Sequence, residues 1–246
     1  MKTDVRPFGI VAHRGLTSGQ MQNTQSAFRR AMALGVDAVE LDVRLTHDMK
    51  LAVHHDYLVD CGDTARPIFE LGSNELRGLR IGPGDAIPML DDVLDEFAGK
   101  IGLEIELKGP EPEAVDVVEP LLVARRGAWD AIEITAFDGA LLRRLRERCA
   151  GLATALLFPA SESWMTDEIV AYAAMHRARA AGASAVHLSA KQLTASVVAT
   201  IRHGGIDVHA HLVDDDDALR RAADCAVPWI CSDVPERALS FRRGSR

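Results

Sequence analysis

The stretch AVELDVRLTHDMKLAVHHD, residues 38–56, places charged side chains on one face of an otherwise apolar strand. Charged residues alternate here with valine and leucine, which is the period of a β-strand, and the charged ones are Glu40, Asp42 and Arg44. The chain then reaches KLAVHHD after too few residues for the crossover that a parallel strand needs. We therefore expect an antiparallel hairpin, which brings His55 close to Asp42.

Strand-like segments recur along the whole chain and alternate with helix-like ones, such as DGALLRRLRERCA. The strand-like segments are residues 8–15, 38–43, 101–109, 131–137, 152–158, 185–190, 206–213 and 227–234. This alternation implies parallel strands with helical crossovers. Eight such units in a chain of 246 residues predict an α/β fold, a TIM (β/α)8 barrel forming a single domain over residues 1–246.

The hairpin and the segment after it interrupt the alternation. Residues from about 57 to 90 are rich in glycine, proline and polar side chains. We interpret them as a small insertion that caps the rim of the barrel above which the hairpin rises.

The composition argues against several classes of partner. A net charge of −8 and an isoelectric point near 5.6 disfavour a nucleic-acid surface. The apolar runs are far shorter than the ~20 residues of a membrane span, so no stable membrane insertion is expected. The first residues lack the apolar core of a signal peptide and the four cysteines form no CxxC, which favours a cytoplasmic location. A homodimer is compatible with a barrel of this size.

Charged residues gather where several barrel strands are expected to end. In such barrels the catalytic groups come from the carboxyl ends of the strands. The residues expected at this mouth are His13, Arg14, Glu40, Asp42, His55, Glu106 and Lys108. Structural ion pairs would explain any one of these carboxylates equally well, but not the whole set at one mouth.

The chemistry of this set indicates a metal and a phosphate. Buried carboxylates are costly unless they are paired or bind a metal, and Glu40, Asp42 and Glu106 offer the oxygen ligands that Mg²⁺ or Ca²⁺ prefers. Arg14 and Lys108 would flank that cation as a site for phosphate oxygens. A pair of histidines can supply a general acid and a general base, so the set predicts cleavage of a small-molecule phosphodiester.

Five motifs resemble the glycerophosphodiester phosphodiesterase family. They are AHRG (12–15), QNTQSAF (22–28), VELDVRLTHD (39–48), AVHHD (52–56) and IELK (105–108). The resemblance implies the phospholipase-C-like variant of the TIM barrel and metal-dependent hydrolysis of glycerophosphodiesters to sn-glycerol 3-phosphate and an alcohol, in glycerol and lipid metabolism. It also implies one divalent cation, Mg²⁺ or Ca²⁺.

The resemblance assigns a role to each residue at the mouth. His13 and His55 would be the acid and base, in an order that stays open, and Arg14 and Lys108 would hold the phosphate. The metal ligands would be Glu40, Asp42 and Glu106. The family chemistry also allows attack by a neighbouring hydroxyl of the substrate, which gives a cyclic intermediate.

Several positions depart from the family pattern. They are Gln22 in place of Glu, Met49 in place of the turn Gly, Ala136 in place of Ser, and His211 and Asp214 in place of Trp and Asn. We favour the glycerophosphodiesterase, but the altered pocket wall leaves an alternative open: a related phosphodiesterase or phospholipase-D-like enzyme with another substrate, such as a sugar phosphodiester, or with a cyclic phosphate as its product. A ligand-binding relative without catalysis would require the loss of a histidine or a metal ligand, and the sequence keeps them all.

Two further histidines are candidates for the pocket wall. His187 ends the sixth strand-like segment, where a core histidine with satisfied hydrogen bonds is at least as good an interpretation. His211 forms an H-x-H pair with His209. That spacing binds metal in amidohydrolase-type barrels, but we favour a pocket-lining role for His211.

Overall fold

The computed structural model describes residues 8–17, 21–82 and 84–244. In this part of the chain, eight parallel strands form a sheet that closes on itself where β1 pairs with both β13 and β2. These strands are β1 (Gly9–Ala12), β2 (Ala38–Leu45), β8 (Gly102–Leu107), β9 (Ile132–Ala136), β10 (Ala153–Leu157), β11 (Ala185–Ser189), β12 (Asp207–His211) and β13 (Trp229–Ser232). The predicted TIM barrel is confirmed, and each strand lies in a segment where the alternation placed one.

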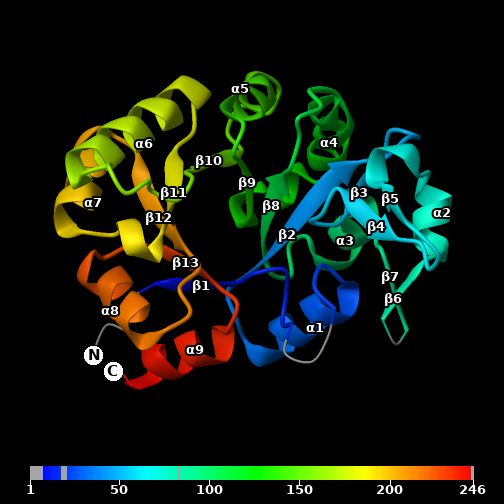
Figure 1. The fold of residues 1–246 in the computed structure, drawn as a ribbon, viewed down its shortest axis with the longest axis horizontal. Coiled ribbons are helices and arrows are strands. Elements are labelled where there is room, and N and C mark those ends of the chain that lie inside the picture. The colour runs from blue at the N-terminus through cyan, green and yellow to red at the C-terminus, as the bar shows by residue number, and fades with distance from the viewer. Residues whose placement is uncertain (1–7, 18–20, 83, 245–246) are drawn as a thin grey trace.

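Helices surround this barrel on the outside (Figure 1). They are α1 (Gln25–Leu34), α3 (Leu90–Phe97), α4 (Glu113–Val123), α5 (Gly139–Arg148), α6 (Asp167–Ala181), α7 (Ala195–His203), α8 (Asp216–Asp224) and α9 (Pro235–Gly244). Short 3₁₀ turns precede β9 (η2, Arg126–Ala131) and follow β11 (η3, Ala190–Gln192). Among the described helices, none combines the length and the apolar character that a membrane crossing requires.

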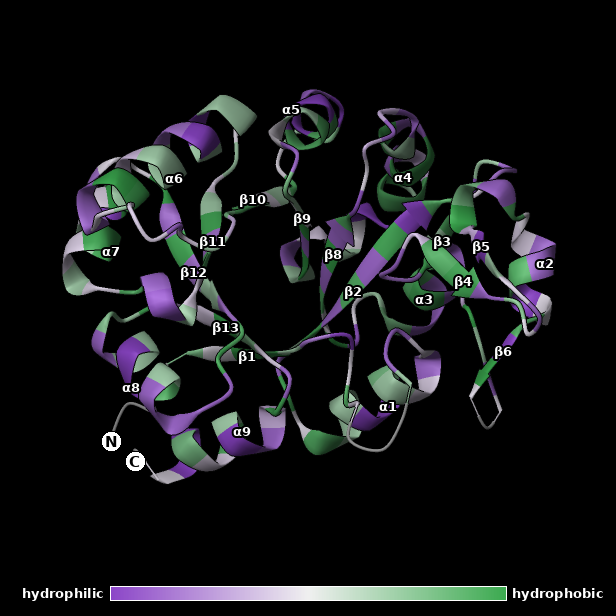
Figure 2. Ribbon diagram, viewed as in Figure 1, coloured by the Kyte–Doolittle hydropathy of each residue, from purple (hydrophilic) through white to green (hydrophobic). Residues whose placement is uncertain are grey.

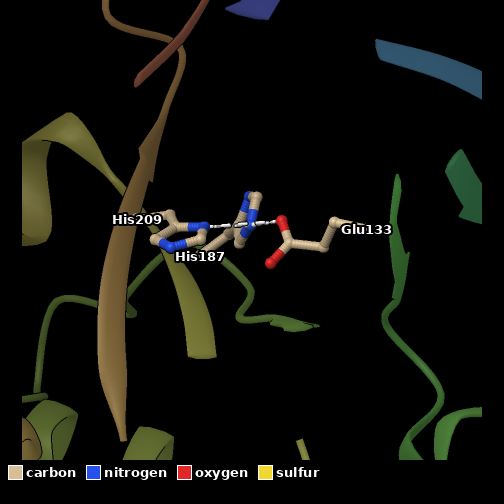
Figure 3. A group of neighbouring side chains, drawn as sticks. All are labelled: Glu133, His187 and His209. Carbon is tan, nitrogen blue, oxygen red and sulfur yellow. Dashed lines mark hydrogen bonds and ion pairs between the residues drawn. The ribbon is translucent and has the colours of Figure 1, made fainter. Parts of the chain in front are cut away.

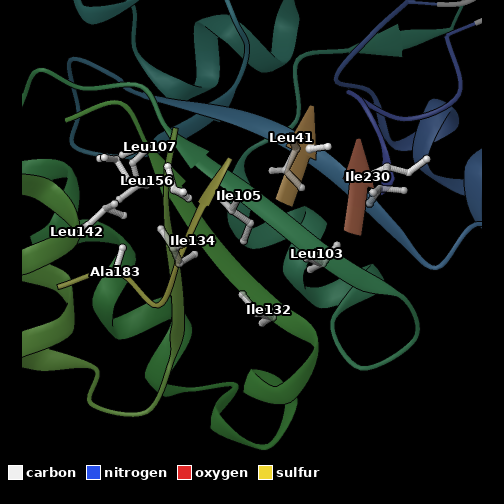
Figure 4. Close-up of a cluster of buried hydrophobic side chains, with 14 of the residues drawn as sticks. Leu41, Leu103, Ile105, Leu107, Ile132, Ile134, Leu142, Leu156, Ala183 and Ile230 are labelled. Atoms are coloured by element: carbon white, nitrogen blue, oxygen red, sulfur yellow. The ribbon is translucent and has the colours of Figure 1, made fainter. Parts of the chain in front are cut away.

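The apolar side of each strand packs outward against the helices. Leu41, Ile105 and Ile134 come from neighbouring strands and are fully buried in one cluster that also holds Leu142 of α5 (Figure 4). Because side chains alternate along a strand, the residues between these apolar positions face the inside of the barrel. The charged face of residues 38–45 is therefore an interior face, and Figure 2 shows the mixed hydropathy along β2.

The hairpin that the sequence predicts is present. β3 (Leu51–Val53) pairs antiparallel with β2, with Val43 opposite Val53. Asp48 fastens its tip: one carboxylate oxygen accepts from the Thr46 hydroxyl at 2.6 Å and the other accepts from the Ser73 hydroxyl at 2.6 Å. The hairpin is therefore held against the segment that follows it.

That segment consists of short elements at one side of the barrel (Figure 1). They are β4 (Leu58–Asp60), β5 (Ala65–Pro67), η1 (Ile68–Glu70), α2 (Ser73–Gly78), β6 (Arg80–Gly82) and β7 (Asp85–Ala86). The strands form two small hairpins, β4 with β5 and β6 with β7, beside the barrel sheet. A separate apolar cluster that includes Val59, Ile68 and Leu76 packs these elements together.

Candidate active site

A cavity of about 200 Å³ lies at the carboxyl ends of the barrel strands. Six of the residues predicted for the mouth line it: His13, Arg14, Glu40, His55, Glu106 and Lys108. Apolar side chains also line it, among them Phe137, Leu157 and Leu212. The structure thus brings together charged groups that lie up to 95 positions apart in the sequence (13 to 108).

The three carboxylates form one buried group. Glu40, Asp42 and Glu106 are 3%, 0% and 7% exposed, and one carboxylate oxygen from each lies within 4.8 Å of the others. The parallel register explains the grouping, because Asp42 of β2 lies directly beside Glu106 of β8. One of their oxygens, Glu106 Oε1, is buried without a hydrogen-bond partner among the described residues.

Two cations border this group. Lys108 Nζ lies 2.9 Å from Asp42 Oδ1 and 2.8 Å from Glu106 Oε2, and Arg14 Nε lies 3.1 Å from Asp42 Oδ2. The guanidinium of Arg14 also donates to Gln22 Oε1 at 2.9 Å. Gln22 stands where the family usually has Glu, so at this position an amide in place of a carboxylate orients the arginine.

Asn23 is a site residue to which the sequence assigned no role. Its amide donates to Asp42 Oδ2 at 2.8 Å, and its carbonyl accepts the Asp42 backbone N–H at 3.2 Å. The Asn23 side chain is buried and its φ is +57°, a left-handed conformation that asparagine tolerates better than most residues. The sequence feature that could have identified Asn23 as a site residue is its position in the QNTQSAF motif.

Each predicted catalytic histidine is oriented by an aspartate. His13 donates from Nδ1 to Asp233 Oδ1 at 2.6 Å, and His55 donates from Nδ1 to Asp56 Oδ1 at 2.7 Å. The Nε2 atom of His13 then faces Glu40, with 3.8 Å between Nε2 and Oε2. Asp56 belongs to the AVHHD motif, whereas Asp233 comes from the loop after β13 and no local pattern connects it to His13.

Burial and charge move the proton affinities of these groups in different directions. Burial, and then the charge of Asp42, raises the pKa of Glu40 well above its usual range, and burial likewise raises the pKa of Glu106. Burial would also raise the pKa of Asp42, but Lys108 and Arg14 more than offset it and hold that pKa low. Burial lowers the pKa of His55. The site therefore has excess negative charge that a bound cation would relieve.

The two histidines expected at the pocket wall lie at different depths. His211, the last residue of β12, lines the cavity, and burial, with smaller contributions from His187 and His13, lowers its pKa to about 4. His187 is not among the residues that line this cavity. It lies at the middle of β11 and is 1% exposed, so its ring sits one layer deeper in the barrel, beside Glu133 (Figure 3). The expectation for His187 is corrected accordingly.

The remaining departures from the family pattern have local structural roles. Met49 occupies the turn of the hairpin with a φ of +56°, the conformation that a glycine would adopt without strain. Asp214 accepts the backbone N–H of Asp233 at 2.8 Å and the hydroxyl of Ser232 at 2.9 Å. Asp214 thus fixes the loop that carries Asp233 to His13. Ala136 is fully buried at the end of β9.

Known proteins resemble this chain in sequence and in fold. The chain is 27% identical over 247 residues to a glycerophosphodiester phosphodiesterase from Caldanaerobacter subterraneus subsp. tengcongensis, covering 95% of this chain and 97% of the relative. It is 26% identical to the Bacillus subtilis enzyme of the same name, covering 95% of this chain and 86% of the relative. The fold matches an Oleispira antarctica phosphodiesterase, solved with the product sn-glycerol-3-phosphate, with a TM-score of 0.79 at 22% identity over 94% of this chain and 95% of the other.

The model of one protein family matches residues 13–237, which include every residue of the site described above. The match covers the hairpin and the insertion as well as the barrel strands, so it extends well beyond the short motifs. The chain therefore belongs to the glycerophosphoryl diester phosphodiesterase family of enzymes.

Proposed function

We propose that this chain hydrolyses glycerophosphodiesters to sn-glycerol 3-phosphate and an alcohol, with a divalent cation bound by Glu40, Asp42 and Glu106. The observation that carries the proposal is the cavity itself. Three buried carboxylates, two cationic side chains and two aspartate-oriented histidines converge there from the ends of separate strands. The relatives named glycerophosphodiester phosphodiesterase support the substrate class.

The carboxylate group fits a hard divalent cation. Glu106 Oε1 is a buried oxygen without a hydrogen-bond partner among the described residues, which is costly unless a cation lies beside it. All three ligands offer oxygen, which suits Mg²⁺ or Ca²⁺. When bound, such an ion would stabilise the negative charge that develops on the phosphoryl oxygens.

Arg14 and Lys108 are placed to hold the substrate phosphate. Both cations already lie within 3.1 Å of Asp42, at the edge of the cavity. A phosphate that enters the cavity can contact both side chains, and the planar guanidinium of Arg14 can offer two parallel donors. The phosphate would thereby be fixed between the two histidines.

We assign the first proton transfer to His55. Its lowered pKa keeps the ring neutral near pH 7, so Nε2 can accept the proton of the attacking hydroxyl, whether from water or from the substrate's own glycerol. His13 is oriented by Asp233 with Nε2 free to donate a proton to the oxygen of the departing alcohol. With water as the nucleophile, one P–O bond forms and one breaks, and proton exchange with solvent restores both histidines. With the glycerol hydroxyl as the nucleophile, the first step gives a cyclic phosphate. Water then opens the ring in a second step, in which His13 accepts a proton and His55 donates one, so that both histidines return to their starting states.

The test is release of glycerol 3-phosphate from a panel of glycerophosphodiesters with Mg²⁺, with Ca²⁺ and with chelator. We expect release that needs the cation and falls by at least ~100-fold in His13→Ala and Glu40→Gln. His47→Ala, an exposed histidine on the hairpin turn, is the matched control and should retain full activity. Metal-independent release, or full activity in Glu40→Gln, would refute the proposed metal site.

The altered pocket wall supports a second candidate, action on a diester with another head group. Leu212 is 46% exposed at the cavity with a φ of +56°, beside His211. Phosphorus NMR of the products separates the two candidates. A cyclic phosphate or a sugar phosphate in place of glycerol 3-phosphate would favour the second.

A further inference from the structure

A second group of potential metal ligands lies inside the barrel, below the candidate active site. Glu133 of β9, His187 of β11 and His209 of β12 point toward one another (Figure 3). The interior of a TIM barrel is normally a packed layer of branched apolar side chains. Here that layer holds titratable groups, and His187 and His209 are only 1% and 8% exposed.

The spacing of the three ligand atoms is that of a tetrahedral metal site. His187 Nε2 lies 3.1 Å from His209 Nδ1 and 3.0 Å from Glu133 Oε2, and His209 Nδ1 lies 3.4 Å from the same carboxylate oxygen. A zinc ion with bonds of ~2.0–2.1 Å in tetrahedral geometry separates its ligand atoms by ~3.3 Å. All three sides of the triangle are close to that length.

Glu104 lies next to this triangle and can orient the ring of His187. His187 Nδ1 lies 3.4 Å from Glu104 Oε1 and has no hydrogen-bond partner within the described residues. A neutral imidazole carries one N–H, so His187 cannot donate to Glu133 and to Glu104 at once when both side chains are ionised. A cation at Nε2 removes that conflict, because Nδ1–H can then face Glu104 in the manner of the carboxylate–histidine–metal arrangement.

A cavity gives this group access to solvent. It has a volume of about 480 Å³ and opens among the residues that begin the strands, at the end of the barrel opposite the candidate active site. Glu104, Glu133 and His209 line it, and small residues such as Gly102, Ala153 and Ala185 leave its interior open. An ion held by the triangle could take its fourth ligand from water in this cavity.

We propose that Glu133, His187 and His209 bind a transition-metal dication, best matched by Zn²⁺, in a site separate from the carboxylate site of the candidate active site. Two imidazoles and one carboxylate suit zinc, whereas the oxygen-only group of Glu40, Asp42 and Glu106 suits Mg²⁺ or Ca²⁺. The ion would tie together β9, β11 and β12 from inside the barrel. It would stabilise the folded chain because the ligands converge only there.

The experiment isolates the triangle by first disabling the carboxylate site. Metal-free Glu106→Gln protein, in which the carboxylate site is disabled, is titrated with Zn²⁺ in competition with a chromophoric chelator. We expect one bound zinc per chain, a higher midpoint of thermal unfolding with zinc, and visible absorption of tetrahedral Co²⁺ when cobalt replaces zinc. The cobalt spectrum reports the ligands without any change to the triangle, so the test does not depend on whether a triangle variant folds.

Matched variants assign the ligands. In the Glu106→Gln background, His209→Gln should weaken zinc binding by at least ~100-fold and abolish the thermal shift, while His203→Gln, an exposed histidine on α7, should leave both unchanged. Glu104→Gln should weaken binding by ~10–100-fold. Failure of Glu106→Gln to bind zinc, or equal binding in its His209→Gln derivative, would overturn the proposal and leave the triangle as a proton-linked hydrogen-bond network.

Discussion

His13 donates from Nδ1 to Asp233 Oδ1 at 2.6 Å across 220 positions of sequence. The two residues follow β1 and β13, which are neighbours in the closed sheet, and Asp214 holds the aspartate loop from β12. The hydrogen bond from His13 is the main reason that the pKa of Asp233 lies below its usual range. Asp233 therefore stays a carboxylate across the neutral pH range and fixes the ring of His13.

Loss of this carboxylate should slow catalysis more than it weakens substrate binding. Asp233→Asn keeps the size of the side chain but lets the His13 ring turn or change tautomer, so we expect kcat to fall by ~10–100-fold with little change in KM. Steady-state kinetics measures both constants. Asp224→Asn, an exposed aspartate at the end of α8, is the control. An unchanged kcat in Asp233→Asn would mean that His13 needs no orienting partner.

The pH profile should report His55 and its partner Asp56. Burial lowers the pKa of His55, and the hydrogen bond that His55 donates to Asp56 raises it by a smaller amount. A base with a lowered pKa stays neutral to lower pH, so kcat/KM should hold its plateau to below pH ~6.5 before it falls on the acid side.

The same reasoning predicts in which direction the kcat/KM profile shifts when Asp56 is replaced. Asp56→Asn removes the interaction that raises the His55 pKa, so the acid limb of the kcat/KM profile should move to lower pH. Asp63→Asn, an exposed aspartate in the insertion that follows Asp56, should leave the limb in place. A shift of the limb to higher pH in Asp56→Asn would contradict the assignment of His55 as the base.

The hairpin turn carries strain that a single substitution should relieve. Met49 is 45% exposed and has a φ of +56°, which costs a side-chain-bearing residue ~1–3 kcal/mol. Met49→Gly should therefore raise the free energy of unfolding by about 1 kcal/mol after the greater flexibility of glycine in the unfolded chain is included.

The same substitution at a second methionine should have the opposite effect on the free energy of unfolding. Met32→Gly makes the same chemical change at an exposed position inside helix α1 and should lower the free energy of unfolding by ~0.5–1 kcal/mol. Chemical denaturation of the two variants and the parent measures both effects. Equal destabilisation by the two changes would show that the turn at Met49 is not strained.

The last helix is fastened to the barrel by a buried ion pair. Arg242 of α9 contacts Asp37 Oδ2, and the same oxygen accepts the backbone N–H of Ile10 at 2.8 Å. The side chains of Arg242 and Asp37 are only 10% and 19% exposed. Arg242→Ala removes a charged hydrogen bond to that carboxylate, so the free energy of unfolding should fall by ~1.5–3 kcal/mol.

The neighbouring Arg243 is exposed and provides the control for this prediction. Arg243→Ala should change the free energy of unfolding by less than ~0.5 kcal/mol. Urea denaturation of both variants separates the two expectations. Similar stability of Arg242→Ala and Arg243→Ala would indicate that the ion pair contributes no net stability.

Much of the candidate active site could be predicted because its residues follow strands whose ends must meet. Glu40 and Asp42 lie on one interior face through simple alternation, and the parallel register puts Glu106 beside Asp42. Partners from distant loops could not be predicted in this way. Asp233 reaches His13 only because the barrel closes β13 onto β1, and Asn23 reaches Asp42 only through a left-handed backbone turn.

The sequence by itself determined the eight strands, the returning hairpin and the set of charges at the mouth, because these depend on local periodicity and short loops. The cytoplasmic location and the homodimer stay predictions. Tertiary structure alone decided the depth of each interior side chain. His187 and His211 both point into the barrel from neighbouring strands, but the register pairs His187 with His209 and Ser189 with His211. His187 therefore lies beside Glu133, and His211 lies one layer higher at the candidate active site. This register depends on how the two strands pair and cannot be derived from either segment alone.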